Sequence, residues 1–279
     1  MQISFCNSND KDYQKRLNAF LTPIFLDFQF WYDLNLWDSN YESYSIISNG
    51  EIISNICVYK SDILFNGKRC QALSMGAVAT KEGHRGNGYS RLLMEHVIDK
   101  YRDTPIYLSA NDTVIDFYPR FGFERVYEKT PIAKYHINNA VRPQKLSYDS
   151  AAVWDHVHGR INYSKKFDCL NTASINIFHI HSGYLSEDIY NIPELDTVVI
   201  AEQQSTVLKI TGVFSLKEIC FADLARFLPF KNVEKIEFGF MPCWDDLEYE
   251  MVDCDPEPLF VRDLRCDLGD FKFPELSVT

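Results

Sequence analysis

The stretch "HRGNGYSRLLMEHVIDKY" (residues 84–101) places an arginine and two glycines between the apolar run "SMGAVAT" (74–80) and a segment with apolar residues at helical spacing. This pattern predicts a strand, a glycine-containing turn and a helix from about residue 88 to 101. Backbone N–H groups at the start of such a helix have no partners within it, and the helix dipole adds positive potential there. The turn therefore suits a phosphate, with Arg85 as a further positive charge, although a plain strand-to-helix turn has the same spacing.

Two familiar phosphate-binding loops do not match this turn. The P-loop requires a lysine directly after its last glycine, and no lysine stands at that place. The dinucleotide fingerprint needs a third glycine inside a parallel strand–helix–strand unit, whereas the preceding strands are expected to be antiparallel. Asn49-Gly50 and Asn66-Gly67 are strong hairpin signals. They predict a meander of three strands, near 43–48, 51–64 and 68–80.

Further elements complete an α+β pattern in the first half. Residues 14–37 predict two short helices separated by a turn, and a short strand is expected at 105–110. The segment "NDTVIDFYPRFGF" (111–123) predicts a short helix that is capped through the Thr113-x-x-Asp116 pattern.

The polar, proline-containing stretch "NNAVRPQKL" (138–146) is the predicted boundary between an N-terminal domain, 1–140, and a C-terminal domain, 141–279. The second half predicts a helix, a strand hairpin, a helix and strands, an order that echoes the first half. It has no similar glycine loop and no nucleophile motif, so we expect a non-catalytic α+β domain that shapes the substrate site or forms a homo-oligomer interface. Its predicted elements lie at 149–161, 197–203, 205–214, 216–228, 233–240 and 258–264.

The hydrophobic content, net charge and cysteine spacing restrict the location and the binding partners that we expect. The 279 residues are 46% hydrophobic without a run of eighteen apolar residues or a secretory signal, so we expect a cytoplasmic protein that does not enter a membrane. A net charge of −11 argues against nucleic acid and favours cationic small molecules or peptides. No CxxC pair or zinc spacing is present, so we expect no metal and reduced, mostly buried thiols. The cysteines are Cys6, Cys57, Cys70, Cys169, Cys220, Cys243, Cys254 and Cys266.

Three motifs together resemble the GNAT superfamily of N-acetyltransferases. Residues 85–90 match the R-x-x-G-x-[G/A] pattern of the family's pyrophosphate loop, except that Ser90 stands at the last position. "MGAVAT" (75–80) is similar to the family's central strand, and "LSANDTVIDFYPRFGF" (108–123) is similar to its following strand and tyrosine-bearing helix. The resemblance spans about residues 74–123 and implies a mixed, mainly antiparallel central sheet flanked by helices.

Within that superfamily, the sequence is most similar to the enhanced-intracellular-survival type of multidomain acetyltransferase. In that group, an N-terminal GNAT domain is followed by a degenerate GNAT-like domain and a sterol-carrier-like domain. A chain of 279 residues is too short for all three. The resemblance therefore implies that the second half is a single module, either degenerate GNAT-like or sterol-carrier-like.

The resemblance also implies acetyl-CoA as co-substrate and direct attack of a primary amine on its thioester, through a tetrahedral intermediate. A backbone N–H of the central strand would stabilise the negative charge on the thioester oxygen. Tyr118 would be the catalytic residue, as the general acid for the leaving thiolate; the alternative is a core aromatic. Asn111 would contact the cofactor or simply cap the next turn. The implied cofactor-binding residues are Val78, Ala79, Thr80, Arg85, Gly86, Asn87, Gly88, Tyr89, Ser90 and Asn111.

The general base is not evident from the sequence. The strand segment "QALSMGAVAT" (71–80) has no carboxylate, where many family members have a glutamate. His84 adjoins the loop and is expected to be a solvated turn residue. In the resembled multidomain group the C-terminal carboxylate enters the active site, and here that residue would be Thr279. A water relay or a carboxylate from another element are the alternatives.

The first helices are expected to border the substrate pocket. Aromatic and acidic residues alternate in "FLDFQFWYDLNLWDSNYESY" (25–44), a mixture that suits a cationic amine through charge and cation–π contacts. The alternative is an aromatic core with acidic residues facing water. The residues concerned are Trp31, Tyr32, Trp37, Asp27, Asp33, Asp38 and Glu42.

Two classes of function follow. The first is an acetyl-CoA-dependent N-acetyltransferase that acts on a small-molecule or peptide amine. The second is a non-catalytic acyl-CoA sensor or binding module with a retained GNAT fold, which the missing strand carboxylate favours. Release of CoA thiol in the presence of an amine panel distinguishes them.

Overall fold

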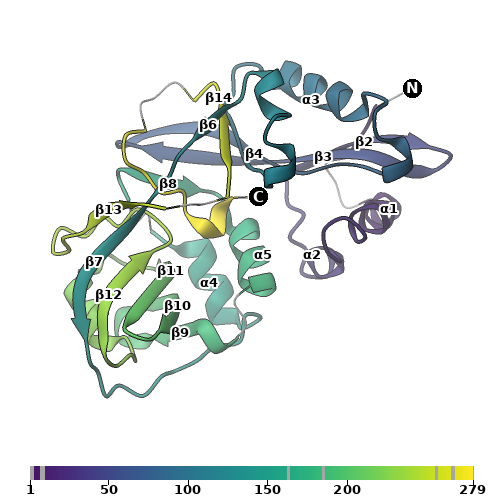
Figure 1. The fold of residues 1–279 in the computed structure, drawn as a ribbon. Coiled ribbons are helices and arrows are strands. Elements are labelled where there is room, and N and C mark those ends of the chain that lie inside the picture. The colour runs from purple at the N-terminus through teal and green to yellow at the C-terminus, as the bar shows by residue number, and fades with distance from the viewer. Residues whose placement is uncertain are drawn as a thin grey trace.

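Two β-sheets, each covered by helices, make up the protein (Figure 1). The computed structural model describes residues 3–6, 10–161, 164–183, 186–254, 257–264 and 268–278. Within these ranges, no helix has the length and apolar character that crossing a bilayer requires.

The first sheet has the order β1-β2-β3-β4-β5-β14-β6, and β8 pairs with the far end of β3. The predicted meander is confirmed, because β2, β3 and β4 are consecutive antiparallel strands. Asn49, Gly50, Asn66 and Gly67 all have positive φ, as tight hairpin turns require. The strands are β1 (Ile3–Cys6), β2 (Tyr41–Ser48), β3 (Glu51–Phe65), β4 (Lys68–Thr80), β5 (Ile106–Ser109), β6 (Glu124–Val126), β8 (Phe167–Leu170) and β14 (Leu259–Arg262).

Helices cover both faces of this sheet. On one face lies α3 (Tyr89–Lys100), which buries Leu93, Met94 and Val97 completely against β2 and β3. On the other face lie α1 (Lys11–Leu21) and α2 (Gln29–Asp33), as Figure 1 shows. The predicted pair of short helices and the helix after the glycine loop are therefore confirmed.

The second sheet has the order β13-β7-β12-β11-β10-β9. In the second sheet, strand β11 is followed by helix α6 and then by β12, which pairs parallel to β11. In the first sheet, β4 is followed by α3 and then by β5, which pairs parallel to β4, so the two halves share this order of elements as predicted. The strands are β7 (Lys129–Ile137), β9 (Ile189–Ile192), β10 (Thr197–Gln204), β11 (Val207–Ser215), β12 (Val233–Phe238) and β13 (Glu250–Asp253). The helices are α4 (Ala151–Gly159), α5 (Ala173–Gly183) and α6 (Phe221–Phe227).

The two sheets do not divide the chain at the expected boundary of residue 140. The change of sheet falls between β6 and β7, and the second half returns two strands, β8 and β14, to the first sheet. β14 lies between β5 and β6, antiparallel to both. The segment 138–146, which was the predicted boundary, lies against the second sheet, because its Lys145 forms an isolated β-bridge with Tyr190 of β9.

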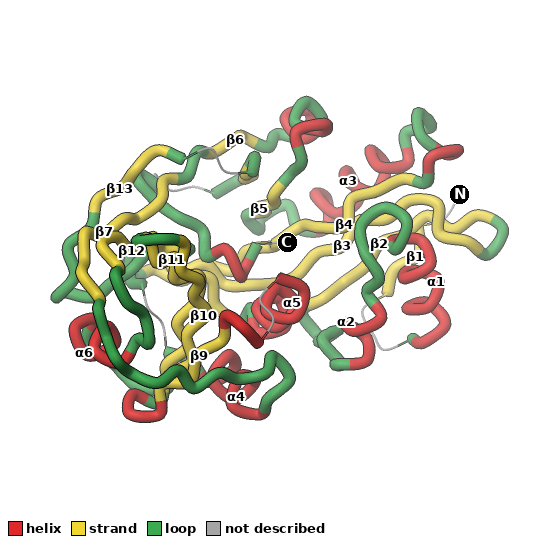
Figure 2. The backbone as a smooth tube through the Cα atoms, turned by 60° about the horizontal axis from the view of Figure 1, so that its bottom comes forward, coloured by secondary structure: helices red, strands yellow, loops and turns green. Residues whose placement is uncertain are grey.

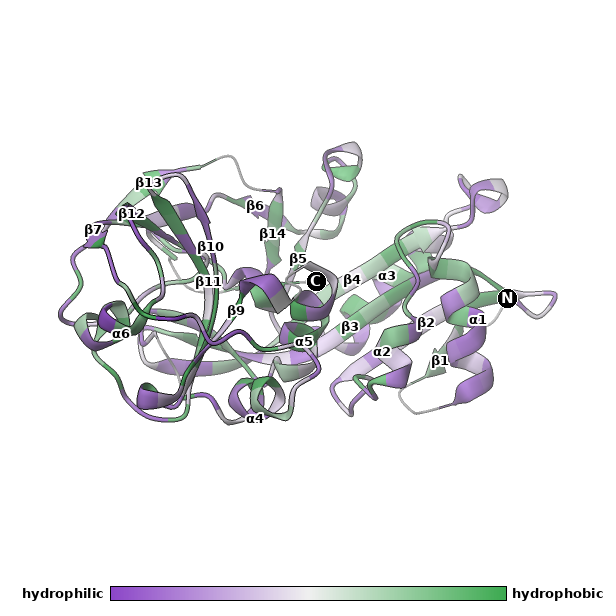
Figure 3. Ribbon diagram, turned by 90° about the horizontal axis from the view of Figure 1, so that it is seen from below, coloured by the Kyte–Doolittle hydropathy of each residue, from purple (hydrophilic) through white to green (hydrophobic). Residues whose placement is uncertain are grey.

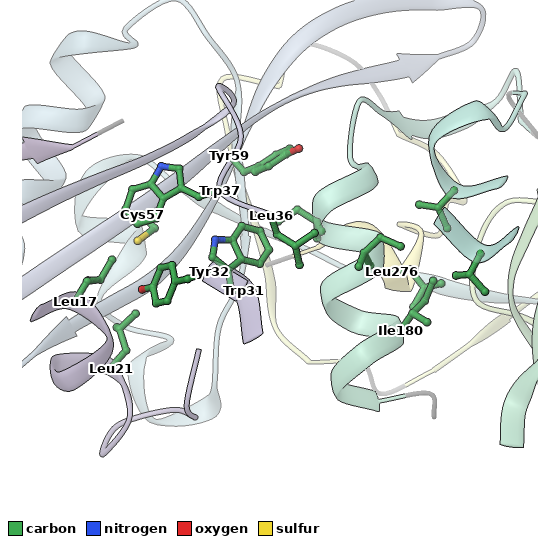
Figure 4. Close-up of a cluster of buried hydrophobic side chains, with 14 of the residues drawn as sticks. Leu17, Leu21, Trp31, Tyr32, Leu36, Trp37, Cys57, Tyr59, Ile180 and Leu276 are labelled. Atoms are coloured by element: carbon green, nitrogen blue, oxygen red, sulfur yellow. The ribbon is translucent and has the colours of Figure 1, made fainter. Parts of the chain in front are cut away.

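A shared hydrophobic core joins the two halves. One cluster of buried side chains includes Trp31 of α2 and, on the opposite side of α5, Ile180 and Leu276, as Figure 4 shows. Helix α5 lies between the two sheets (Figure 2), and Figure 3 shows hydrophobic residues on the central strands with hydrophilic bands on α1. The halves are thus packed through apolar side chains rather than tethered by a linker.

The cysteines depart from expectation. Cys6, Cys57 and Cys169 are buried, whereas Cys70, Cys220, Cys243 and Cys254 are exposed, so the prediction of mostly buried thiols is wrong. The exposed thiols lie at the start of β4 or in the connections outside strands and helices, where no core covers them. None of these seven forms a disulfide within the described part of the chain, and Cys266 lies outside the described residues.

Candidate active site

A wedge opens between β4 and β5. These parallel strands pair only through Leu73 with Ile106 and Ser74 with Tyr107. Past Ser74, β4 continues to Thr80 while β5 ends at Ser109. The backbone groups of β4 on this side face a cavity of about 770 Å³ instead of a neighbouring strand.

A β-bulge shapes the open part of β4. Asn55 of β3 pairs with Ala79 and Cys57 pairs with Gly76, so β4 carries one extra residue there. Ala77 has a φ of 50°, an uncommon conformation for a residue with a side chain. A bulge turns backbone N–H groups out of the ladder, and here the strand residues around it line the cavity.

A buried polar network supports the bulge. Asn55 Nδ2 donates to the Ala77 carbonyl at 3.3 Å, and Asn55 Oδ1 accepts from the hydroxyls of Ser43 and Ser45 at 2.8 Å each. The Tyr13 hydroxyl bonds both serines, at 2.9 and 2.6 Å. Sequence reasoning missed this network, because its members come from α1, β2 and β3 and carry no local motif.

The glycine loop presents unpaired backbone donors. Gly86 and Gly88 both have a φ of 79°, which a residue with a Cβ rarely adopts. In the described part of the chain, the backbone N–H groups of residues 86–91 meet no protein acceptor, and the first bond of α3 runs from Leu92 to Gly88. Arg85 lines the cavity and donates from Nε to the Thr80 carbonyl at 3.2 Å. The loop has the donors and the charge that a pyrophosphate needs.

Ser90 links the helix to the strand. Its hydroxyl lies 2.7 Å from the Thr80 hydroxyl, which in turn lies 2.8 Å from the Ser54 hydroxyl. The side chain that departs from the family pattern is therefore used to fix the first turn of α3 against β4. Both Ser90 and Thr80 line the cavity.

Tyr118 lies on the wall of the cavity, in a 3₁₀ turn (Tyr118–Phe121). It is 5% exposed, and burial raises the pKa of its hydroxyl to about 12. No described protein group hydrogen-bonds this hydroxyl, which makes it available to a ligand. The phenol is neutral at ordinary pH and can act as a proton donor.

The segment around Asn111 differs from the prediction. The expected Thr113 cap is wrong, because Asn111 is the cap and its Oδ1 accepts from the Thr113 N–H at 2.8 Å. Instead of one α-helix, the segment forms two 3₁₀ turns, and Pro119 removes a donor from the second. Asn111 also lines the cavity, so its capping role and a place beside a ligand coexist.

The structure thus brings most of the expected cofactor residues to one cavity. Val78, Ala79, Thr80, Arg85, Ser90, Asn111 and Tyr118 line it. Gly86, Asn87, Gly88 and Tyr89 form the loop at its edge, where Asn87 Nδ2 donates to the His84 carbonyl at 3.0 Å.

The turn after α1, together with α2 and α5, borders the other part of the cavity. The turn after α1 contributes Ile24, Phe25 and Leu26, and α5 contributes Ile175 and Phe178 from the second half. Sequence reasoning missed α5 entirely, since its apolar face gives only a weak helical period.

The expected acidic lining is absent from the described cavity wall. Asp27 accepts from Asn18 Nδ2 at 2.8 Å, and Asp33 accepts from Gln29 Nε2 at 2.8 Å. Asp38 Oδ2 accepts from the hydroxyls of Tyr59, at 2.7 Å, and Ser174, at 2.8 Å. These carboxylates are committed to protein donors, and among the described lining residues Arg85 alone is charged.

Glu42 is likewise buried in an ion-pair cluster away from the cavity. Its side chain is 4% exposed and meets Lys60 Nζ at 2.6 Å and Lys100 Nζ at 3.1 Å. Burial alone would raise the pKa of Glu42, but hydrogen bonds from Lys60, Tyr101, Tyr44 and Lys100 outweigh it and lower the pKa to about 2. Its role is structural.

The aromatic residues of the first helices divide between the cavity and the core. Trp31 lines the cavity, whereas Tyr32 and Trp37 pack in the core beside α1. For these two residues the core alternative holds, and of the three aromatic residues expected in the pocket Trp31 alone is among the described lining residues.

No described cavity-lining residue is a glutamate, aspartate or histidine. His84 ends a 3₁₀ turn (Glu82–His84) outside the lining. Near the C-terminal end, the Val278 carbonyl lies 2.7 Å from His179 Nε2, and Asn176 Nδ2 donates to Ser277 Oγ at 3.0 Å. His179 and Asn176 both belong to α5, the helix that also contributes to the cavity lining. Thr279 lies outside the described residues.

Comparison with known proteins agrees with this geometry. Residues 19–126 match the sequence model of the acetyltransferase (GNAT) domain. No curated protein sequence matches the chain significantly. The stretch that contains the wedge, the glycine loop and Tyr118 is therefore a GNAT acetyltransferase domain.

The whole chain is similar to larger solved structures. A protein of Enterococcus faecalis V583, described as a probable N-acyltransferase, has a TM-score of 0.58 at 14% identity, over 94% of this chain and 72% of its own. Eis1 from Mycobacterium abscessus has a TM-score of 0.56 at 14% identity, over 94% and 73%. A GCN5-related N-acetyltransferase from Kribbella flavida has 0.55 at 14% identity, over 93% and 70%. The fold is thus shared over 93–94% of this chain.

Proposed function

We propose that the protein is an N-acetyltransferase that transfers an acetyl group from acetyl-CoA to a primary amine. The observation that carries the proposal is the convergence of three separate elements on one cavity: the bulged strand β4, the unpaired N–H groups of the loop, and the free hydroxyl of Tyr118. Acetyl-CoA supplies the thioester when bound.

The chain's own groups have distinct tasks in this proposal. Backbone amides of residues 86–91 and Arg85 would hold the pyrophosphate at the start of α3. Backbone N–H groups at the bulge would donate to the thioester oxygen as it gains negative charge. The Tyr118 hydroxyl would donate its proton to the sulfur as the carbon–sulfur bond breaks, while the amine nitrogen forms the amide and loses a proton to water.

The alternative function, acyl-CoA binding without chemistry, is favoured by the lack of a carboxylate or imidazole among the described lining residues. Titration calorimetry with acetyl-CoA and continuous detection of CoA thiol with an amine panel separate the two functions. Binding with amine-dependent thiol release supports the transferase. Binding without release by any amine would leave the binding module as the function.

A further inference from the structure

The part of the cavity away from the cofactor elements has an apolar, aromatic wall. Ile24, Phe25, Leu26, Phe28 and Trp31 come from the α1–α2 region. Tyr41, Tyr59, Ile175 and Phe178 complete this surface, which we call the acceptor wall.

Aromatic contacts hold the acceptor wall in shape. Phe178 of α5 stacks on Phe28 with ring centroids 5.7 Å apart and planes at 11°. The same ring meets Trp31 edge to face at 5.8 Å, and Trp31 lies 5.3 Å from Tyr41. The wall therefore joins both halves of the chain and presents ring faces and edges, which favour a further aromatic ring.

The rim of the wall exposes three consecutive apolar residues. Ile24 is 36%, Phe25 50% and Leu26 36% exposed. Asn18 of α1 fixes this turn, because its side chain donates to Asp27 and accepts from the Phe28 N–H, both at 2.8 Å. Exposed apolar residues on a fixed turn beside a cavity indicate a surface that is covered when a ligand binds.

The acceptor wall offers no charge to a cation. The Tyr59 hydroxyl donates to Asp38, and that carboxylate also accepts from Ser174, so it lies behind the wall rather than in it. A second ammonium group on the acceptor would lose its water without gaining a carboxylate partner from the described lining.

The same absence of charge helps the reacting amine. An ammonium group in an uncharged, apolar site has a lowered pKa, because burial disfavours its charged form. A larger share of the bound amine is then neutral and nucleophilic. This makes a dedicated carboxylate base less necessary in a cavity whose described lining has none.

We propose that the acceptor is a monoamine on an aromatic body, an arylalkylamine, whose ring packs against the acceptor wall formed by Phe28, Trp31 and Phe178. The proposal rests on the proposed function for its chemistry, whereas the preference for an aromatic body can be measured by binding alone.

The test compares 2-phenylethylamine with 1,5-diaminopentane on the full chain. We expect kcat/KM for CoA thiol release to be roughly 100-fold higher for 2-phenylethylamine, from the burial of one phenyl ring. Calorimetry on the CoA-loaded protein should show the same order of affinity. Equal values for the two amines, or a preference for the diamine, would overturn the proposal.

Two variants and a control locate the effect. Phe178→Ala should lower kcat/KM for 2-phenylethylamine by roughly 10-fold with unchanged acetyl-CoA affinity. Phe25→Asp at the exposed rim should raise the rate with 1,5-diaminopentane relative to 2-phenylethylamine. The control is Phe227→Ala, a partly buried phenylalanine of α6 in another core, which should change neither ratio.

The outcomes separate this inference from the proposed function. Tighter binding of 2-phenylethylamine without thiol release would refute the transferase and support the aromatic binding preference. The rival occupant of the acceptor wall is a longer acyl chain, which hexanoyl-CoA probes. The inference fails if Phe178→Ala lowers the rate with hexanoyl-CoA but leaves kcat/KM for 2-phenylethylamine unchanged, because the wall then holds the acyl chain.

Discussion

Tyr118→Phe tests the proposed chemistry most directly, because it removes one hydroxyl and no described protein hydrogen bond. The ring is buried and packs 5.9 Å from Phe123 and 5.5 Å from Phe260, contacts that phenylalanine keeps. We therefore expect a change of less than about 0.5 kcal/mol in the free energy of unfolding.

The loss of rate follows from the role of the hydroxyl. If Tyr118 is the general acid of the proposed reaction, a neutral donor to the developing thiolate is worth about 2–4 kcal/mol, or roughly 30- to 900-fold in kcat. Acetyl-CoA affinity should change less than about threefold, because the ground-state thioester carries no charge for the hydroxyl to stabilise.

The pH dependence gives an independent check. Since the pKa of Tyr118 is raised to about 12, the donor is fully present below that value and is lost only as the pH rises through it. The wild-type rate between pH 6 and 10 should therefore show no alkaline loss from this group. Tyr118→Phe should have a profile of the same shape at a lower level.

The assay is CoA thiol release with the best amine of the panel, together with calorimetry and urea unfolding. Tyr44→Phe is the matched control, because this buried tyrosine donates to Glu42 at 2.5 Å outside the cavity. It should lose about 1.5–3 kcal/mol of stability and keep its turnover per folded molecule. Unchanged kcat in Tyr118→Phe, with the control behaving as expected, would remove Tyr118 from the mechanism.

Three further changes probe the cofactor loop, the bulge and the ion-pair cluster. Ser90→Trp should weaken CoA binding more than about tenfold in calorimetry, because an indole would fill the first turn of α3; an unaltered Kd would argue against this loop as the cofactor site. Asn55→Ala should lower the free energy of unfolding by about 2–3 kcal/mol, because the hydroxyls of Ser43 and Ser45 and the Ala77 carbonyl each lose a hydrogen-bond partner. A change of less than about 0.5 kcal/mol in urea unfolding would contradict this. Because the pKa of Glu42 is lowered to about 2 from 4.5, its stabilisation of about 1–2 kcal/mol is present above pH 4.5 and is lost as the pH falls towards 2. Glu42→Gln should abolish that part of the acid dependence of unfolding, and an identical pH profile in the variant would refute the assignment.

Local signals in the sequence predicted the cofactor side of the site. The Asn-Gly pairs predicted the meander, because both residues of these tight turns need positive φ. The glycine loop predicted the start of α3, where Gly86 and Gly88 have the backbone angles that free the donors. Each of these features depends on residues that are close in the sequence, so pattern reasoning could find them.

Other features could not be predicted locally. Nothing near residues 259–262 indicates that this strand lies between β5 and β6 of the first sheet. The acidic residues of the first helices looked available to a substrate, yet Asp38 is bonded to Ser174, far away in the sequence. A carboxylate's availability depends on which donors the fold brings to it.

By itself, the sequence determined a GNAT-type glycine loop and central strand, because turn angles, helix starts and strand periods are properties of adjacent residues. Only the tertiary structure decided the character of the acceptor wall. Phe178 reaches it from α5, the carboxylates are withdrawn behind it, and Asn55 holds the bulge beside it. These are contacts between segments far apart in the chain, and burial and hydrogen-bond satisfaction are settled only when those segments meet.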